Sequence, residues 1–565
     1  MGDVRILLRL LRLMKPYAGW MLLGVALSAV TVLANVALMA LAGWFIATMA
    51  IGGLAGVLVN YFMPSAGIRA FAILRTGGRY GERIVTHEAT FRLIARLRVW
   101  LFERLVPLAP AQLQDWRGAD LVSRVQADVD TLQNAYLRLF VPLAVALVCT
   151  LAIVAGLGLA SGTIAWVVLG LLVVAGAVVP GLAYRAAARS GAELVAAKAE
   201  LRVAVVDALQ GMTDLQVYGA GARAADQMGM LGATLGERQR RVARLGSLAE
   251  GVVGLCAGLA MVSAAGLAIA GVAAGALVPA QVPLLALAAL AAFEAVAPLP
   301  AALQRVGETA AAARRIFALA DETPRIPEET KPSPQPADAG LVLRGVRMRY
   351  APDAPFALDG LDLDVPDGRR VAVVGPSGAG KSSIARLLLR FWDYEAGEIR
   401  LGGADLRAFR EPDLRGRIGV LSQDTQLFNA TIRENLRMAA PTADEAAMLA
   451  ALKAAQLDAL VAALPDGLDS FVGEGGVRLS LGQGRRLALA RVLLRDPPIL
   501  LLDEPTEGLD AETGRALLAA VTAQAAGRTL IVITHRVEDV RGLVDEIVRI
   551  EDGRVVSRGP AGAEV

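Results

Sequence analysis

Long apolar runs alternate with charged segments over the first 300 residues of the chain. Six runs are long enough, as helices, to cross a hydrocarbon layer of ~30 Å at ~1.5 Å per residue. They lie near residues 19–47, 56–77, 138–160, 163–184, 247–275 and 280–303. The joins after the first, third and fifth runs contain no Lys or Arg, whereas every alternate segment is rich in both. Because basic residues concentrate on the cytoplasmic side of a membrane, both termini are predicted to be cytoplasmic.

The segments that flank this region have their own patterns. Residues 1–18 place Arg5, Arg9 and Arg12 at helical spacing among leucines, which predicts an amphipathic elbow helix on the inner membrane surface. The membrane region is expected to occupy residues 19–321, with charged helical extensions into the cytoplasm after its second and fourth spans. Residues 322–340 are rich in Pro, Glu and Lys and are predicted to form a linker.

Short apolar runs in residues 341–565 predict buried strands separated by helices, which indicates an α/β domain. One run, residues 371–374, leads into the segment G-P-S-G-A-G-K-S at 375–382. In such a loop, backbone N–H groups surround phosphate, Lys381 neutralises the β- and γ-phosphates, and the Ser382 hydroxyl reaches Mg²⁺. The residues of this loop that are predicted to bind ATP are Gly375, Ser377, Gly378, Gly380, Lys381, Ser382 and Ser383.

Two acidic residues, Asp503 and Glu504, end another apolar run, residues 499–502. One carboxylate is placed to hold Mg²⁺ and the next to polarise a water molecule. Gln423 is expected to sense the metal and the γ-phosphate, and His535 ends a further apolar run. The sequence therefore predicts ATP hydrolysis, with Glu504, His535 and Lys381 as catalytic residues and with Mg²⁺ held by Ser382, Gln423 and Asp503.

On these segments, residues from about 341 to 560 resemble the nucleotide-binding domain of ABC ATPases. The resemblance implies that Tyr350 stacks on adenine and that residues 508–510 form a loop where two such domains meet. It also implies that the signature segment L-S-L-G-Q at 479–483 completes the ATP site of a second domain, through Ser480, Gly482 and Gln483. A chain with a single copy is therefore expected to work as a dimer.

The signature segment departs from the pattern of that family. Leu481 stands where glycine is usual, and Gly484 stands where a basic residue is common. A leucine at this place can push the loop away from phosphate or be tolerated at its rim. The two ATP sites of the dimer are therefore predicted to differ.

The membrane half has a more specific resemblance. Residues 78–83, 86–91 and 97–100, with residues 42–45 and the segment E-P-T-E-G-L-D at 504–510, are similar to the CydC family, which supplies one subunit of the bacterial heterodimeric CydDC exporters. The resemblance covers essentially the whole chain. It implies the type IV ABC exporter fold, a multidomain membrane protein with an all-α domain of six spanning helices and a C-terminal α/β ATPase domain.

That resemblance also implies the biological setting. The expected place is the bacterial cytoplasmic (inner) membrane, with the ATPase domain in the cytoplasm and a CydD-like half-transporter as partner. The expected function is ATP-driven transport that supports cytochrome bd assembly, with haem or the thiols cysteine and glutathione as substrate. Residues 118–124, with Asp128 and Asp130, and residues 211–219 resemble the intracellular turns that dock on the ATPase domains of ABC exporters, and Glu474 resembles the loop that touches them.

Arg75, Arg79, Arg83 and His87 recur at every fourth position and therefore share one broad helix face, which is expected to line an aqueous cavity. Guanidinium groups can pair with haem propionates or with the carboxylates of glutathione. His87 can ligate haem iron, but it is equally readable as a packing residue, with the arginines as membrane anchors. Glu294, inside the sixth run, should be paired or line the pathway.

Composition limits the other function classes. Hydrophobic residues make up 55% of the chain, which disfavours a soluble ABC ATPase, and a net charge of +3 gives no support for nucleic-acid binding. Cys149 and Cys256 lie in predicted spans without metal-ligand spacing and are expected to be buried thiols. Two rival functions remain, a homodimeric lipid or drug exporter and an ATP-dependent haem-binding membrane sensor.

Overall fold

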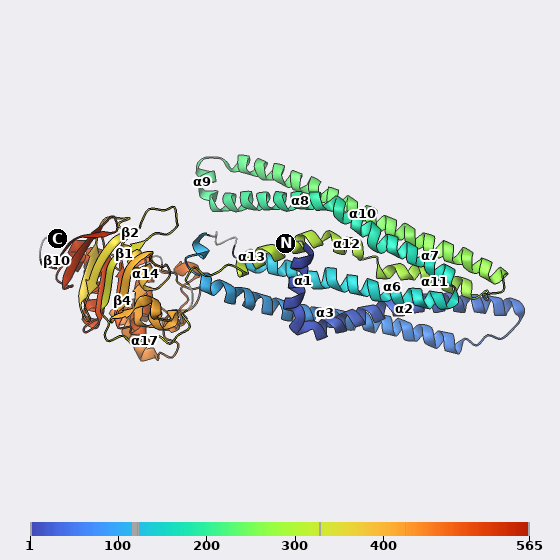
Figure 1. Cartoon of the computed structure of the whole chain (residues 1–565), viewed down its shortest axis with the longest axis horizontal. Coiled ribbons are helices and arrows are strands. Elements are labelled where there is room, and N and C mark those ends of the chain that lie inside the picture. Colours follow the sequence, from blue (N-terminus) through green and yellow to red (C-terminus); the bar gives the residue numbers. More distant parts are fainter. Residues whose placement is uncertain (1–2, 116–120, 122–123, 327–328, 424, 563–565) are drawn as a thin grey trace. The chain divides into compact units, whose positions relative to one another are not determined.

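The computed structural model describes residues 3–115, 121, 124–326, 329–423 and 425–562. It divides into two compact units. The first consists of Met1–Pro107 and Trp116–Glu322, and the second consists of Leu108–Asp115 and Thr323–Val565. Figure 1 shows that the first unit is helical and that the strands belong to the second.

The first unit is a bundle of long helices (Figure 1). Its α-helices are α1 (Asp3–Met14), α2 (Ala18–Ala55), α3 (Phe62–Leu105), α5 (Val129–Ala135), α6 (Val141–Ala160), α7 (Gly162–Val173), α8 (Val179–Gln210), α9 (Met212–Val217), α10 (Gly221–Ala273), α11 (Gln281–Ala292), α12 (Leu299–Gln304) and α13 (Val306–Ala320). Helix α2 packs on α3, α6 and α11, and α10 packs on α7, α8 and α11. The short helix α9 joins α8 to α10 at the end of a long hairpin.

Small residues allow these helices to approach closely. A side chain on Gly43 of α2 would meet the carbonyl oxygen of Pro283 at 2.8 Å, so only glycine fits where α2 meets α11. Close approach through small residues is typical of helices that associate inside a membrane. Large apolar side chains point outward on the same bundle, for example Leu22, Leu151 and Trp166, which are 68%, 64% and 74% exposed. The bundle therefore has the apolar exterior of a membrane domain.

Among the described residues, five helical segments are long and apolar enough to cross a membrane. They are Arg5–Ala55, Val125–Ala160, Gly162–Ala186, Gly221–Ala273 and Gln281–Gln304, and they correspond to five of the six predicted spans. The remaining prediction, at 56–77, corresponds to α3 but was placed wrongly. Gly56 ends α2 in a left-handed conformation, α3 begins at Phe62, and Arg69 and Arg75 interrupt the apolar sequence of α3.

The amphipathic N-terminal helix α1 uses its apolar face inside the protein. Ile6, Leu10 and Met14 are buried, and α1 packs on α13 near the end of the bundle. Arg9 forms an ion pair with Asp321 at 2.5 Å and lies over the ring of Phe317. Part of the apolar surface of α1 is therefore covered by α13, while Leu8 and Leu11 remain 51% and 36% exposed.

The second unit contains two sheets. Its strands are β1 (Leu341–Met348), β2 (Leu358–Val365), β3 (Arg370–Val374), β4 (Ala396–Leu401), β5 (Ala404–Asp405), β6 (Ile418–Leu421), β7 (Ile499–Asp503), β8 (Thr529–Thr534), β9 (Glu546–Glu551) and β10 (Arg554–Pro560). The smaller sheet has the order β2-β1-β4-β5, and the larger has the order β10-β9-β3-β8-β7-β6. In the larger sheet, β9, β3, β8, β7 and β6 are parallel, so their carboxyl ends share one edge.

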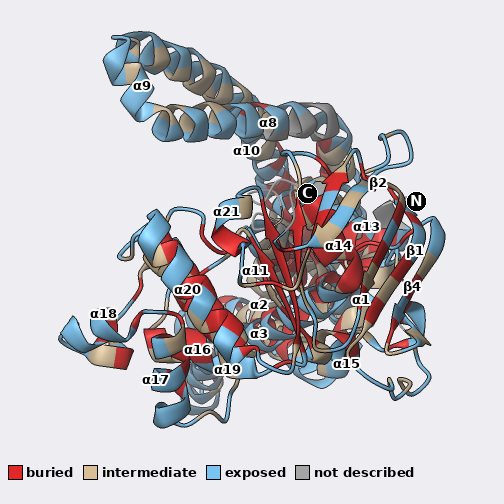
Figure 2. Ribbon diagram, turned by 90° about the vertical axis from the view of Figure 1, so that its left-hand side faces the viewer, coloured by how far each residue is buried: buried red, intermediate tan, exposed pale blue. Residues whose placement is uncertain are grey.

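The α-helices of this unit are α14 (Lys381–Leu388), α15 (Glu411–Arg417), α16 (Ile432–Arg437), α17 (Glu445–Ala454), α18 (Asp458–Ala463), α19 (Leu481–Arg495), α20 (Ala511–Gln524) and α21 (Val537–Val540). Helices α14, α15 and α19 contact strands of the larger sheet, whereas α16 and α17 pack on α19. Alternate residues of β3 serve two cores. Val371 and Val373 pack with α14, whereas Ala372 and Val374 pack with α19 and α20. Because both of their faces are covered, the central strands β7 and β8 are fully buried (Figure 2), which explains why their sequences are almost entirely apolar.

One ion pair ties the start of β3 to the start of β9. Asp545 accepts hydrogen bonds from the backbone N–H of Arg370 at 2.9 Å and from its guanidinium at 2.6 Å. The Arg370 side chain therefore holds the pKa of the Asp545 carboxyl below its usual range. A carboxyl with a lowered pKa in the folded state stabilises the protein above its ordinary pKa, and this contribution is lost as the pH falls.

We expect Asp545→Asn to lower the free energy of unfolding of the ATPase unit by about 1–3 kcal/mol at pH 7, because a charge-assisted pair is lost. The difference from wild type should shrink as the pH falls below the ordinary carboxyl range, about pH 4. Thermal unfolding of the full chain in detergent, repeated from pH 7 to below pH 4, measures the loss of stability and its pH dependence. The exposed Asp353→Asn serves as control, and equal melting of both variants would contradict the assignment.

Candidate functional site

The phosphate loop lies between β3 and α14, at the carboxyl edge of the larger sheet. Gly378 and Gly380 have φ angles of 84° and 92°, which side-chain-bearing residues rarely adopt. A Cβ on Gly380 would also lie 2.1 Å from the carbonyl oxygen of Ala357. The loop is thus shaped by backbone that only glycine permits, and it delivers the N-terminus of α14 to the edge of the sheet.

Lys381 spans this loop from inside. Its Nζ donates hydrogen bonds to the carbonyl oxygens of Gly375 at 2.8 Å and Pro376 at 2.7 Å. Burial lowers the pKa of Lys381, and the nearby carboxylates of Glu504 and Asp503 oppose this shift. A buried ammonium that bonds to neutral carbonyl groups is poised to pair with an anion.

The acidic end of β7 lies beside the loop because β8 pairs with both β3 and β7. Asp503 is buried, and burial raises the pKa of its carboxyl while a hydrogen bond from Ser382 opposes the shift. Glu504 has a left-handed φ of 49°. Its carboxylate oxygens contact Nδ1 of His535 at 3.1 Å and the side-chain amide of Gln423 at 3.3 Å. Side chains that follow β6 and β8 thus both contact the carboxylate that follows β7.

The oxygen donors predicted for Mg²⁺ fit the ion. Asp503 and Ser382 are hydrogen-bonded to one another, and Gln423 lines the same pocket as Ser382. A carboxylate, a hydroxyl and an amide oxygen are ligands that Mg²⁺ accepts alongside phosphate oxygens. The Asp503 carboxylate is buried at the carboxyl end of β7, where a divalent cation would also offset the burial of its charge.

These residues line a pocket of about 590 Å³. The predicted residues that line it are Tyr350, Ser377, Gly378, Gly380, Lys381, Ser382, Ser383, Gln423, Glu504 and His535. The Tyr350 hydroxyl is 2.7 Å from the Ser383 hydroxyl, and its ring meets Trp392 edge to face with a centroid distance of 5.3 Å. The pocket therefore joins a phosphate-binding end to an aromatic end.

Two residues that the sequence analysis did not single out, Ala357 and Glu507, also line this pocket. Glu507 forms an ion pair with Arg485, at the start of α19, at 2.5 Å. Glu507 lies in the segment E-P-T-E-G-L-D at 504–510, three residues after Glu504, so its closeness in the sequence could have indicated a place in the pocket. Its partner lies 22 residues earlier, and only the fold shows that the two meet.

The signature residues lie at the N-terminus of α19, and they are not among the residues that line the pocket around Lys381. Ser480 caps the helix: its hydroxyl accepts from the backbone N–H of Gln483 at 3.2 Å, and the Gln483 side chain accepts from the N–H of Ser480 at 2.8 Å. Gly482 is buried, and Leu481 is 74% exposed. Leu481 is therefore presented on the surface of the domain.

The predicted basic face of α3 surrounds a hollow of about 370 Å³ lined by Arg75, Thr76, Arg79, Tyr80 and Arg83. Arg75 donates to the side-chain oxygen of Asn35 at 3.0 Å. Arg79 donates to Glu294 at 3.3 Å, and Asn35 donates to the same carboxylate. Glu294 is paired, as its place within an apolar helix requires.

His87 is not among the residues that line this hollow. Its Nδ1 lies 2.8 Å from the carbonyl oxygen of Arg83, and its ring meets Phe91 edge to face. Within the part of the chain that is described, no group of three or more His, Cys, Asp or Glu side chains is placed to hold a metal ion. Cys149 and Cys256 are buried free thiols.

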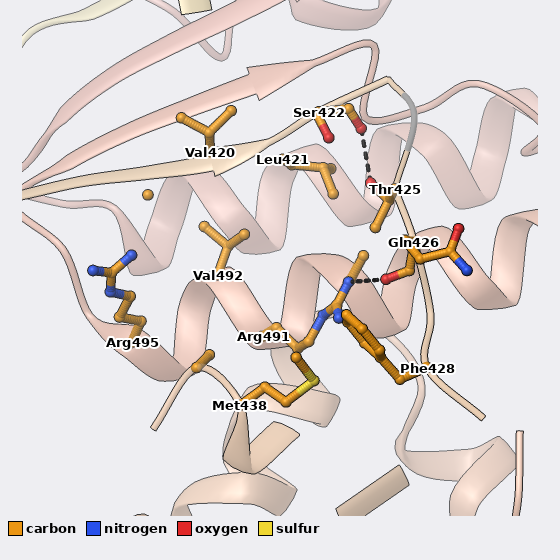
Figure 3. A pocket seen from close by; sticks show the side chains of 13 residues that line it. Val420, Leu421, Ser422, Thr425, Gln426, Phe428, Met438, Arg491, Val492 and Arg495 are labelled. Carbon is orange, nitrogen blue, oxygen red and sulfur yellow. Dashed lines mark hydrogen bonds between the residues drawn. The ribbon is translucent and has the colours of Figure 1, made fainter. Parts of the chain in front are cut away.

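A second hollow of the ATPase unit, about 520 Å³, lies between β6 and α19 (Figure 3). Phe428 and Met438 line it and are 47% and 55% exposed. Arg491 points toward the segment after β6 and donates to the carbonyl oxygen of Gln426 at 2.9 Å (Figure 3). Burial lowers the pKa of Arg491. The hollow thus offers apolar surface beside a partly buried cation.

The predicted docking turns are described unequally. The second, at 211–219, contains α9. Val217, the last residue of α9, and Tyr218, which follows it, are 74% and 78% exposed. The first, at 118–124, lies mostly outside the described residues. Asp128 and Asp130, which follow it, pair with Arg315 and Arg98 inside the bundle. Glu474 begins a short turn before α19.

Known proteins resemble this chain over different lengths. The ABC transporter family model matches residues 358–507. The glutathione/L-cysteine transport system ATP-binding/permease protein CydC of Escherichia coli K12 is 38% identical over 98% of this chain and 97% of its own. The CydC protein of Haemophilus influenzae is 35% identical over 98% and 96%. A bacterial Atm1-family ABC exporter solved with ATP bound superimposes with a TM-score of 0.81 at 25% identity, covering 98% of this chain and 95% of that one.

We expect Glu504→Gln to lower ATP hydrolysis by about 10²–10⁴-fold, because the amide cannot accept a proton from water. Binding of MgATP should remain, since Lys381 and the phosphate loop are unchanged. Hydrolysis by the detergent-purified transporter and nucleotide binding are the two measurements. Glu512→Gln, an exposed acid on α20, is the matched control. Unchanged turnover in the Glu504 variant would remove this residue from its role.

Proposed function

The chain belongs to the CydC family of ABC transporters, and we propose that it is one half of a heterodimeric exporter of cysteine and glutathione, paired with a CydD-like subunit in the bacterial cytoplasmic membrane. ATP hydrolysis coupled to transport is the activity of its family and fold. One observation carries the proposal for the ATP site: Glu504 is held by His535 and Gln423 in the pocket that also contains Lys381.

The chemistry follows from this placement. The N–H groups of the phosphate loop and Lys381 bind the β- and γ-phosphates, and Tyr350 packs on the base. Glu504 orients a water molecule for in-line attack, while His535 fixes the carboxylate and contacts the γ-phosphate. Ser382, Asp503 and Gln423 would hold Mg²⁺, which would neutralise charge on the phosphates. The bond between the β–γ bridging oxygen and the γ-phosphorus breaks, and phosphate and ADP leave.

The proposed partner supplies the missing side of this site. Ser480, Gly482 and Gln483 cap α19 away from the pocket, so a signature segment must come from a second subunit to cover the nucleotide. This chain's signature would cover the partner's nucleotide, and there the exposed Leu481 replaces a small residue. The two ATP sites of the dimer would then differ in activity.

We propose that helix α9 docks into the hollow between β6 and α19 of an ATPase unit. The exposed Val217 and Tyr218 match the apolar side chains Phe428 and Met438 of that hollow. The hollow adjoins the segment after β6 that contains Gln423, so a nucleotide-dependent shift of this segment would reach α8 and α10. Closure of the ATPase units would thereby switch the bundle between its two orientations.

The substrate would bind at the basic hollow of α3. Arg75, Arg79 and Arg83 line it, and Glu294 is the acid that pairs with this cluster, so positive charge remains for a ligand. Cysteine and glutathione carry carboxylates that guanidinium groups bind bidentately. Their thiol needs no charged partner. A thiol compound that carries a carboxylate therefore fits the basic hollow. Its export would support cytochrome bd assembly.

Haem is the second candidate, because one observation favours it. The Nδ1 of His87 is engaged by the carbonyl of Arg83, which leaves Nε2 as the nitrogen available to iron. Propionates could occupy the arginines of the same face. A homodimeric lipid or drug exporter is disfavoured by the match of the whole chain to CydC proteins.

Transport is tested with the chain and its partner in vesicles whose ATPase side faces outward. Radiolabelled glutathione and cysteine should accumulate only with hydrolysable MgATP. Arg79→Gln should raise the substrate KM about tenfold, because one charge-assisted contact is lost. Arg69→Gln, on the same helix but outside the hollow, is the matched control. Accumulation of neither thiol in wild-type vesicles would refute the substrate proposal.

Haem binding is tested by absorption spectra of the purified heterodimer with added haem. If haem is the ligand, a Soret shift should appear in wild type and be lost in His87→Ala, because the iron loses its imidazole. His535→Ala, the other histidine of the chain, should keep the shift. A shift that persists unchanged in His87→Ala defeats the ligand role, and stimulation of ATP hydrolysis by thiols alone favours the first substrate class.

A further inference from the structure

A buried charge joins the signature helix to the nucleotide pocket. The Arg485 side chain on α19 is 6% exposed and donates to the Glu507 carboxylate at 2.5 Å. Its second terminal nitrogen donates to the main-chain oxygen of Asp503 at 3.3 Å. Glu507 is 42% exposed and lines the pocket that contains Lys381. One guanidinium therefore contacts both the end of β7 and a pocket acid.

A second contact joins the same two segments. Leu481, the first residue of α19, lies over Gly508, where an added Cβ would be 3.4 Å from the Leu481 side chain. A Cβ on Gly482 would lie 2.7 Å from the Leu509 side chain. Leu481, which departs from the ABC signature, thus lies within van der Waals reach of Gly508, the residue after Glu507. The start of α19 therefore packs closely against the turn at 504–509.

The turn itself is tied to the catalytic acid. The backbone N–H of Glu507 donates to the carbonyl oxygen of Glu504 at 3.2 Å, and Thr506 donates to Asp539 at 2.9 Å. The main chain of Glu507 is therefore hydrogen-bonded to that of Glu504, in a turn that Thr506 anchors to Asp539. Its carboxylate faces a site for a triphosphate, where an uncompensated negative charge would repel the ligand.

We infer that Arg485 is a positioning residue that neutralises the pocket acid Glu507, so that this chain binds ATP tightly only while α19 is seated against the turn at 504–509. The helix that presents the signature to a second subunit would thereby set the ATP affinity of this chain's own pocket. The inference rests on the proposed function only in taking the ligand of the pocket to be a nucleoside triphosphate.

The test measures MgATP and MgADP binding by the purified heterodimer, with Glu504→Gln in every sample to prevent hydrolysis. Arg485→Gln should raise the Kd for MgATP about tenfold, because one compensating charge is removed. The Kd for MgADP should rise by a smaller factor, because ADP carries less negative charge than ATP. Arg485→Lys, which keeps the charge, should bind MgATP within about twofold of the parent.

The double variant Arg485→Gln/Glu507→Gln separates charge from packing. It should bind MgATP within about twofold of the parent, because neither charge remains. Equally weak binding by the double variant and by Arg485→Gln would show a packing defect and overturn the inference. Unchanged binding by Arg485→Gln would also overturn it.

The variant Glu507→Gln tests the same inference without changing Arg485. The Arg485 side chain keeps its hydrogen bond to the main-chain oxygen of Asp503 in this variant, so its seat in the fold is preserved. It should bind MgATP about threefold more tightly than the parent, because a positive charge is left beside the pocket. Equal or weaker binding contradicts the inference. The proposed function fails separately, if the parent itself binds no MgATP.

Discussion

The nucleotide pocket depends on the parallel pairing of β8 with both β3 and β7. That register brings three strand ends to one edge of the sheet. The phosphate loop follows β3, the acids Asp503 and Glu504 end β7, and His535 follows β8. Because side chains at the carboxyl ends of adjacent parallel strands are neighbours, residues more than a hundred positions apart line one pocket. The buried faces of these strands hold the register.

The second constraint is that charged side chains inside the protein need polar partners. Both units supply them through hydrogen bonds and ion pairs. In the ATPase unit, Lys381 bonds to loop carbonyls and Arg485 bonds to Glu507 and to Asp503. In the bundle, Glu294 accepts from Arg79 and from Asn35. An unpaired charge in either place would be costly, so each pair fixes the segments that supply it. The same pairs lie at the two places where we propose that an anionic ligand binds.

The sequence predicted much of the fold and part of the site. The apolar runs predicted the strands and most membrane helices, because these segments are buried on several sides or face lipid. The glycine loop, Asp503 and Glu504 were predictable because their chemistry depends on neighbours in the sequence. The start of α3 was misplaced because the segment from Gly56 to Tyr61 is mostly apolar, apart from Asn60, and yet is not helical. The pairs Arg485–Glu507 and Arg79–Glu294 could not be foreseen, since they join residues that only the tertiary structure brings together.

The proposed function requires that ATP be enclosed between two different subunits, one of which is this chain. The most direct measurement is the rate of ATP hydrolysis by the purified chain alone in detergent, compared with the rate after co-purification with its CydD-like partner. Hydrolysis should appear only when both subunits are present, because Ser480 and Gly482 of this chain do not reach its own pocket. Hydrolysis at the full rate by the chain alone would contradict the proposed pairing.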